Sequence, residues 1–87
     1  DLEFITGEPD NNYFMVVSSL RTEERARAMA NKYKADGHDV GVVLNKRRSW
    51  YYVFLSKPGD FDQGIKELYK LRNSQPEFKD AWIHIYK

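Results

Sequence analysis

The sequence predicts an α+β fold of the ferredoxin-like βαββαβ type, with a four-stranded antiparallel sheet and two helices on one face. Three observations support it: apolar residues alternate in four short segments, recur with helical spacing in two others, and the same element order occurs twice. The 87 residues suffice for one domain with a single core. We expect residues 1–12 to form a linker and a turn, and residues 13–87 to form the domain.

The first half of the chain is predicted to contain a strand, a helix and a second strand. Residues 13–18 combine aromatic and β-branched side chains, which favours a strand. Thr22 can cap a helix, and Gly37 suits the end of that helix because glycine readily adopts a left-handed backbone conformation. Residues 39–45 alternate apolar and other side chains, as a second strand would.

The second half repeats this order after a short polar connection at residues 45–49. Residues 50–56 are predicted to pair with the preceding strand as an antiparallel hairpin. Asp60, with Gln63 three residues later, resembles a capping box that begins a second helix. Residues 81–86 alternate again and predict the last strand.

The segment 50–55 is the most informative one, because neighbouring side chains of a strand point to opposite faces of the sheet. If the helices cover the aliphatic face, the other face is bare and aromatic. The residues expected there are Phe14, Val16 and Ser18, then Trp50, Tyr52 and Phe54, then Trp82, His84 and Tyr86. Large exposed apolar patches usually mark binding surfaces, and flat rings suit sugar rings or nucleobases. Alternatively, the linker or an oligomer partner partly covers these rings.

Composition argues against several classes of function. Fourteen basic and 13 acidic residues give a net charge of +1, unlike the strongly basic surface of a typical nucleic-acid binder. The chain has no cysteine, which excludes disulfide and thiol chemistry. No carboxylate pair, nucleophile set or metal-ligand spacing stands out, so we predict no enzyme activity, no cofactor and no metal site. No apolar run approaches the roughly 20 residues of a membrane span. Because the chain starts at Asp1, we interpret it as a fragment whose membrane anchor, if any, lies in the missing part.

Five short motifs occur in the order found in one known family. Tyr13-Phe14-Met15-Val16-Val17-Ser18-Ser19-Leu20 matches its aromatic first strand, and Glu24-Arg25-Ala26 and Gly37-His38-Asp39 match its first helix. Trp50-Tyr51-Tyr52-Val53 matches the third strand, and Ala81-Trp82-Ile83 the last. Together, over residues 13–86, these motifs resemble the SPOR (sporulation-related repeat) domain of bacterial cell-envelope proteins.

The resemblance implies non-catalytic binding of peptidoglycan across the bare sheet face, in particular of glycan strands stripped of their stem peptides. It implies contacts from Val16, Ser19, Trp50, Tyr52 and Trp82. Val16 stands where the family has glutamine, and Tyr52 stands where it has arginine. Both differences replace hydrogen-bonding groups with apolar surface, so we expect a changed ligand preference or a lower affinity.

These considerations predict one ligand-binding site and no catalytic residues. The predicted ligand-binding residues are Phe14, Val16, Ser19, Arg48, Trp50, Tyr52, Phe54, Trp82 and His84. Lys46, Arg47 and Arg48 could meet the lactyl carboxylate of peptide-free muramic acid, or they could simply remain solvated. The expected role is to target the parent protein, as a monomeric domain in the bacterial periplasm, to the cell wall or the division site.

The alternative is an RNA recognition motif, which has the same element order and stacks RNA bases on sheet aromatics. Arg48, Trp50 and Tyr52 roughly fit its third-strand signature. However, Ser49 and Tyr51 stand where that signature requires glycine and a small residue. The near-zero net charge also disfavours a surface that follows a phosphate backbone.

Overall fold

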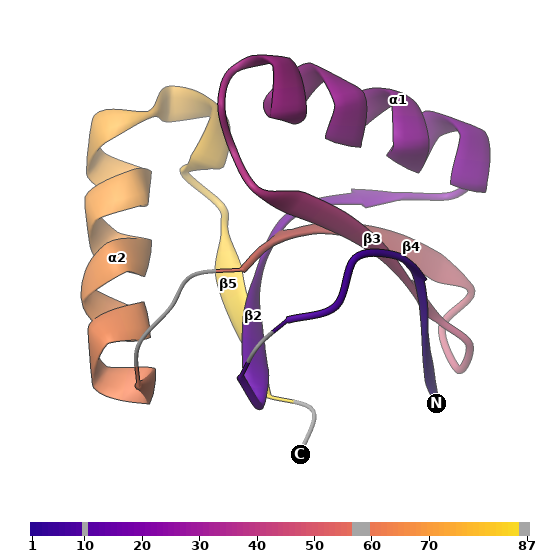
Figure 1. Cartoon of the computed structure of the whole chain (residues 1–87), viewed down its shortest axis with the longest axis horizontal. Helices are drawn as coiled ribbons and strands as arrows, with labels where there is room; N and C mark the ends of the chain where they lie inside the picture. The colour runs from indigo at the N-terminus through magenta and orange to yellow at the C-terminus, as the bar shows by residue number, and fades with distance from the viewer. Residues whose placement is uncertain (10, 57–59, 86–87) are drawn as a thin grey trace.

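The computed structural model describes residues 1–9, 11–56 and 60–85 (Figure 1). The elements are β1 (Leu2–Thr6), β2 (Tyr13–Leu20), α1 (Glu23–Ala35), β3 (Val40–Asn45), β4 (Trp50–Leu55), α2 (Phe61–Ser74), the 3₁₀ turn η1 (Pro76–Phe78) and β5 (Trp82–Ile85). The strands form one antiparallel sheet in the order β1-β3-β4-β2-β5. The α+β class is thus as predicted, and β2 to β5 have the ferredoxin-like order. The described sheet nevertheless has five strands, whereas the sequence predicts four. Tyr86 lies outside the described residues.

The fifth strand is β1, which pairs with β3 at the edge of the sheet. The interpretation of residues 1–12 as a linker and a turn is therefore wrong for residues 2–6. The β1–β3 register shifts between Phe4 and Thr6, and the Thr6 hydroxyl accepts a hydrogen bond of 3.1 Å from the Val42 N–H. This side-chain bond satisfies a backbone donor where the ladder is irregular.

Both helices begin at the residues that the sequence predicts. The Thr22 hydroxyl accepts a hydrogen bond of 3.2 Å from the Arg25 N–H at the start of α1. Asp60 and Gln63 form a capping box at the start of α2, in which each side chain accepts from the other's backbone N–H. In Figure 1, α1 lies along the sheet and α2 stands beside β5. Residues of both helices enter the same core, so both pack on one face.

The two faces of the sheet carry two separate cores. The helix-side core contains Met15, Val42, Val53 and Leu55 of the strands, with Ala26, Ala30, Tyr33, Leu68 and Leu71 of the helices. The opposite core contains Phe14, Val16, Val43, Tyr52 and Phe54, with Leu2, Phe4 and Trp50 packed against it. The alternation predicted for residues 50–55 is thus confirmed: Tyr52 and Phe54 point away from the helices.

A bulge in β2 changes this alternation at one place. The β2–β4 register shifts between Val16 and Ser18. The Ser18 hydroxyl is hydrogen-bonded to the hydroxyl of Tyr33 in α1 at 3.1 Å, so Ser18 lies on the helix side. The expectation that Ser18 lies on the bare face is therefore wrong, because a bulge adds one residue to the count. Ser19 instead lies opposite Tyr52 and shares its face.

Candidate ligand-binding site

The N-terminal strand covers half of the face that the helices leave bare. The Phe4 ring packs edge-on against Phe14 and Phe54, with centroids 6.0 and 5.8 Å away. Phe14, Phe54 and Val16 are each 1% exposed. We therefore correct the sequence prediction for these three side chains, which form a second core instead of the accessible floor of a site. The alternative that the N-terminal segment partly covers the rings holds for this half of the face.

The other half remains open, and we call Trp50, Tyr52, Trp82 and His84 the open aromatic patch. Trp82 is its most accessible ring, 36% exposed, and packs edge-on against Tyr52 and His84 at 5.5 and 5.7 Å. Trp50 and His84 are half-buried, whereas Tyr52 is only 6% exposed. Tyr52 can therefore offer a ligand very little surface. Four of the nine predicted residues are thus in this patch, and the exposed Ser19 lies beside Tyr52.

Two neighbours of the patch are not among the residues predicted from the sequence. The Arg21 guanidinium lies 4.3 Å from the centre of the Trp50 ring, a cation–π contact that occupies one face of the indole. Asn45 donates a hydrogen bond of 3.3 Å from Nδ2 to the Tyr52 hydroxyl. Both contacts join residues from different strands or loops, so they depend on the pairing register and not on a local motif.

The basic residues of the β3–β4 hairpin differ in their surroundings. Lys46 lies 3.5 Å from the Glu3 carboxylate, and Arg47 lies 3.8 Å from that of Asp1. Exposed pairs of this kind contribute little stability, about 0–1 kcal/mol. Within the described chain Arg48 makes no ion pair, while its backbone N–H donates to Asn45 Oδ1 at 3.3 Å. The Arg48 guanidinium is thus without an ion pair among the described residues, in the hairpin that leads into Trp50.

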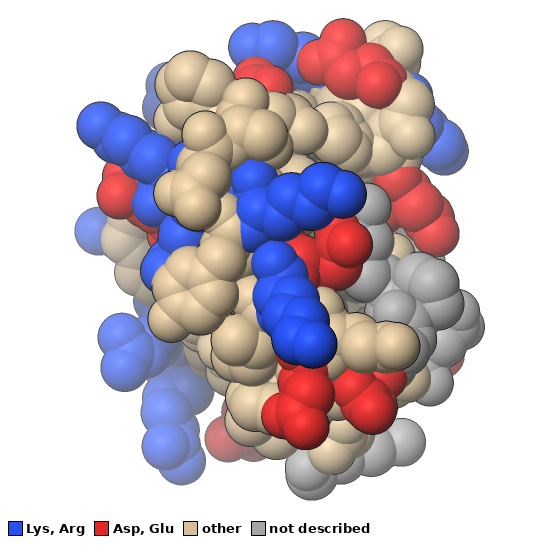
Figure 2. Space-filling model, turned by 90° about the vertical axis from the view of Figure 1, so that its left-hand side faces the viewer, with Lys and Arg blue, Asp and Glu red and all other residues tan. Residues whose placement is uncertain are grey.

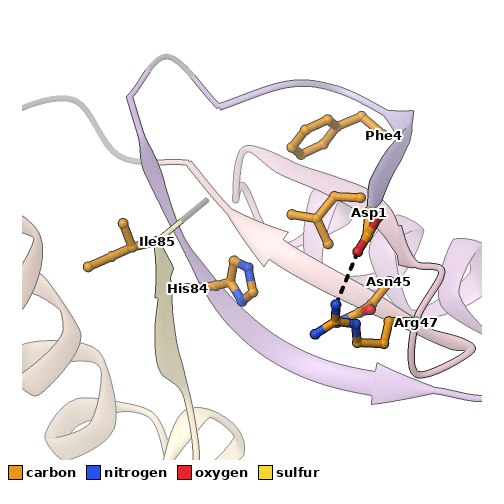
Figure 3. Close-up of a pocket in the computed structure, with 7 residues that line it drawn as sticks. Asp1, Phe4, Asn45, Arg47, His84 and Ile85 are labelled. Atoms are coloured by element: carbon orange, nitrogen blue, oxygen red, sulfur yellow. Dashed lines mark ion pairs between the residues drawn. The ribbon is translucent and has the colours of Figure 1, made fainter. Parts of the chain in front are cut away.

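A cavity of about 510 Å³ continues from the open aromatic patch. It is lined by Asp1, Leu2 and Phe4 from the N-terminal segment, by Asn45 and Arg47 from β3 and the hairpin, and by His84 and Ile85 from β5 (Figure 3). Since β1 and β5 are the two edges of the sheet, both can line one cavity only if the sheet curls around it. The aromatic face is thus concave.

The position of His84 favours the neutral form of its ring. Its ring stacks on Phe14 with the centroids 5.2 Å apart, and burial lowers the pKa of His84 below the ordinary value of 6.5. A neutral imidazole offers one hydrogen-bond donor and one acceptor, a combination that suits hydroxyl groups. At neutral pH this side chain therefore adds polarity to the patch without adding charge.

This lowered pKa predicts a stability loss in mild acid. As the pH falls through about 6.5, the unfolded chain takes up a proton at His84 that the folded protein resists, so the free energy of unfolding decreases. We expect wild type to lose more stability than His84→Gln between about pH 7.5 and pH 5.5, measured by urea unfolding. Parallel pH profiles of the two proteins would show that the folded and unfolded chains bind this proton equally well.

The described residues contain no group of three or more His, Cys, Asp or Glu side chains placed to hold a metal ion. Within the same residues, neither helix is long and apolar enough to cross a lipid bilayer. The features that stand out on the bare face are therefore the open aromatic patch and the cavity beside it.

Comparison with known proteins agrees with this picture. Residues 9–78 match the family model of the SPOR domain, which confirms the resemblance seen in the sequence. The matched range runs from the residues before β2 to η1 and leaves out β1 and β5. No curated protein and no solved structure matches the chain. Because the match covers most of the sequence, the chain belongs to the SPOR domain family, a family of non-catalytic peptidoglycan-binding domains found in bacterial cell-envelope proteins.

Proposed function

We propose that this domain binds the glycan strands of peptidoglycan on the open aromatic patch, and that it prefers strands without stem peptides. The observation that supports this most directly is the exposure of Trp82 on a concave face away from the helices. The C–H groups of a sugar ring stack on an aromatic face and bury apolar area at low entropic cost. Trp82 would carry the main stacking contact, with Trp50 contributing the ring face that Arg21 leaves open.

Polar groups around the patch would orient the sugar. Neutral His84 and the Ser19 hydroxyl suit sugar hydroxyls, and Asn45 holds the Tyr52 hydroxyl at the edge of the patch. Removal of stem peptides exposes the lactyl carboxylates of muramic acid, which the free guanidinium of Arg48 could pair with. We propose that this preference brings the parent protein, in the periplasm, to places where amidases have acted, such as the division site. The domain would act there as a monomer.

The affinity should be modest. An open face buries less of its ligand than an enclosed pocket does, so we expect a micromolar dissociation constant, about −8 kcal/mol.

Trp82→Ala tests the proposed site. The variant should bind amidase-treated sacculi about tenfold more weakly than wild type, because a lost stacking contact is worth roughly 1–1.5 kcal/mol. Binding is measured by co-sedimentation, and folding by the thermal unfolding curve. The matched control is Tyr69→Ala, which removes a ring that is 56% exposed on α2. Equal binding by the two variants would contradict a site at Trp82.

The same assay separates glycan from RNA as the ligand. Figure 2 shows Lys and Arg side chains interspersed with Asp and Glu over the side of the molecule where α2 lies, and the whole sequence has a net charge of only +1. Binding through a phosphate backbone weakens steeply with salt, whereas stacking on sugars should change little between about 50 and 200 mM. Binding to single-stranded RNA with a steep salt dependence, and no binding to sacculi, would overturn the proposal.

A further inference from the structure

We propose that the cavity between β1 and β5 is a subsite for a carboxylate-bearing sugar of the glycan strand, with Arg47 as the partner of the carboxylate. This inference rests on the function proposed above and extends it to β1, which lies outside the range that matches the family model. At about 510 Å³ the cavity has the size of a small-molecule site.

The walls of the cavity are preorganised on the β1 side. Leu2 and Phe4 contribute apolar surface, and the Phe4 ring is fixed by its edge-on contacts with Phe14 and Phe54. A ligand that contacts Phe4 therefore does not have to order a mobile side chain, which lowers the entropic cost of binding. Such a wall suits the C–H face of one sugar ring.

The polar groups of the cavity favour an acidic sugar over a neutral one. His84 and Asn45 provide uncharged hydrogen-bonding groups, and the positive charge comes from Arg47 (Figure 3). The Arg47 guanidinium now lies 3.8 Å from the Asp1 carboxylate, and these side chains are 81% and 71% exposed. So long and exposed a pair is weak, so a ligand carboxylate can replace Asp1 at small cost. Asp1 thereby competes with the ligand for the same guanidinium.

The cavity and the open aromatic patch are continuous. His84 belongs to both, because it lines the cavity and packs edge-on against Trp82 at 5.7 Å. Tyr52 joins them a second time, since its ring contacts Trp82 and its hydroxyl accepts from Asn45. A strand that stacks one sugar on Trp82 can thus place a neighbouring sugar in the cavity.

Two substitutions with opposite expected effects test the subsite. With soluble peptide-free glycan fragments in calorimetric titrations at low salt, Arg47→Gln should raise the dissociation constant roughly threefold, the size expected for one exposed ionic contact. Asp1→Asn should lower it about twofold, because it frees Arg47 and removes a repelling charge. Lys46→Gln is the matched control, since it removes the same charge from a neighbouring residue that pairs with Glu3 and does not line the cavity.

The ligand can be changed as well as the protein. Converting the fragment carboxylates to methylamides should weaken wild-type binding by at least this threefold factor, because Arg48 loses its partner as well, and wild type and Arg47→Gln should then bind the amidated fragments equally. If Arg47→Gln leaves the dissociation constant unchanged while Trp82→Ala still raises it, the subsite is refuted, whatever amidation does, and glycan binding on the open aromatic patch stands. If Trp82→Ala has no effect either, the proposed function fails too.

Discussion

Replacing Phe54 by alanine is expected to lower the free energy of unfolding by about 4 kcal/mol. The Phe54 ring is 1% exposed although it points away from both helices. Phe14 packs beside it at a centroid distance of 4.9 Å, and Phe4 covers it from β1. Alanine would leave a cavity in this second core and remove the support of Phe4. For a domain whose total stability is about 5–15 kcal/mol, such a loss is severe.

Urea unfolding followed by circular dichroism measures this effect. Tyr69→Ala serves as the reference, because its ring is 56% exposed on α2 and its loss should change stability by no more than about 0.5 kcal/mol. The comparison of the two variants decides whether the Phe54 ring is buried beneath β1 or exposed on the sheet face. If Phe54→Ala is as mild as Tyr69→Ala, the ring lies at the surface and β1 does not cover it.

The features predicted correctly from the sequence are those that depend on neighbouring residues. Alternation in residues 50–55 assigns Tyr52 and Phe54 to the face opposite the helices because a strand has a fixed period. Thr22 and Asp60 mark helix starts because a cap needs only an oxygen and the amides of the next turn. The order of strands β2 to β5 follows from short connections and the two helices.

The features that were missed depend on contacts distant in sequence. Leu2–Thr6 is a short segment, and it becomes β1 by pairing with β3, some 40 residues later. The alternation of side chains along a strand shows which face Phe14, Val16 and Phe54 occupy. It cannot show whether another segment covers that face. This is why three predicted contact residues are core residues.

The bulge in β2 has a comparable effect on the site itself. Strict alternation would place Ser18 on the aromatic face, whereas the extra residue turns Ser18 to Tyr33 and Ser19 to Tyr52. The resemblance to the family selects Ser19 and not Ser18, and Ser19 is the one of the two that lies on the aromatic face. Strict alternation therefore selects Ser18 for the aromatic face, whereas the family motif selects Ser19 in the same strand.

The close approach of the end of β1 to β3 depends on a missing side chain at Gly41 in β3. A Cβ atom there would lie 2.4 Å from Cζ of Phe54 and 2.5 Å from the Thr6 carbonyl oxygen. Real carbon contacts are longer by about an ångström, and a backbone carbonyl cannot rotate away as a side chain can. Gly41→Ala should therefore destabilise the protein by about 3 kcal/mol.

Gly37→Ala provides the matched control for this substitution. A Cβ atom at Gly37 would meet no atom within 4 Å, although its φ of +95° disfavours alanine. We expect a cost of only about 1–2 kcal/mol there, from backbone strain alone. Urea unfolding measures both variants, and hydrogen exchange shows where the structure has changed.

The pattern of hydrogen exchange distinguishes a steric clash between Gly41→Ala and β1 from the backbone strain expected for Gly37→Ala. If Gly41→Ala separates β1 from β3, the β1 amides should exchange faster while those of β2 and β4 remain protected. The lost strand would also remove Phe4 and Asp1 from the lining of the cavity. A Gly41→Ala protein with fully protected β1 amides and wild-type stability would show that the end of β1 does not lie this close to Gly41.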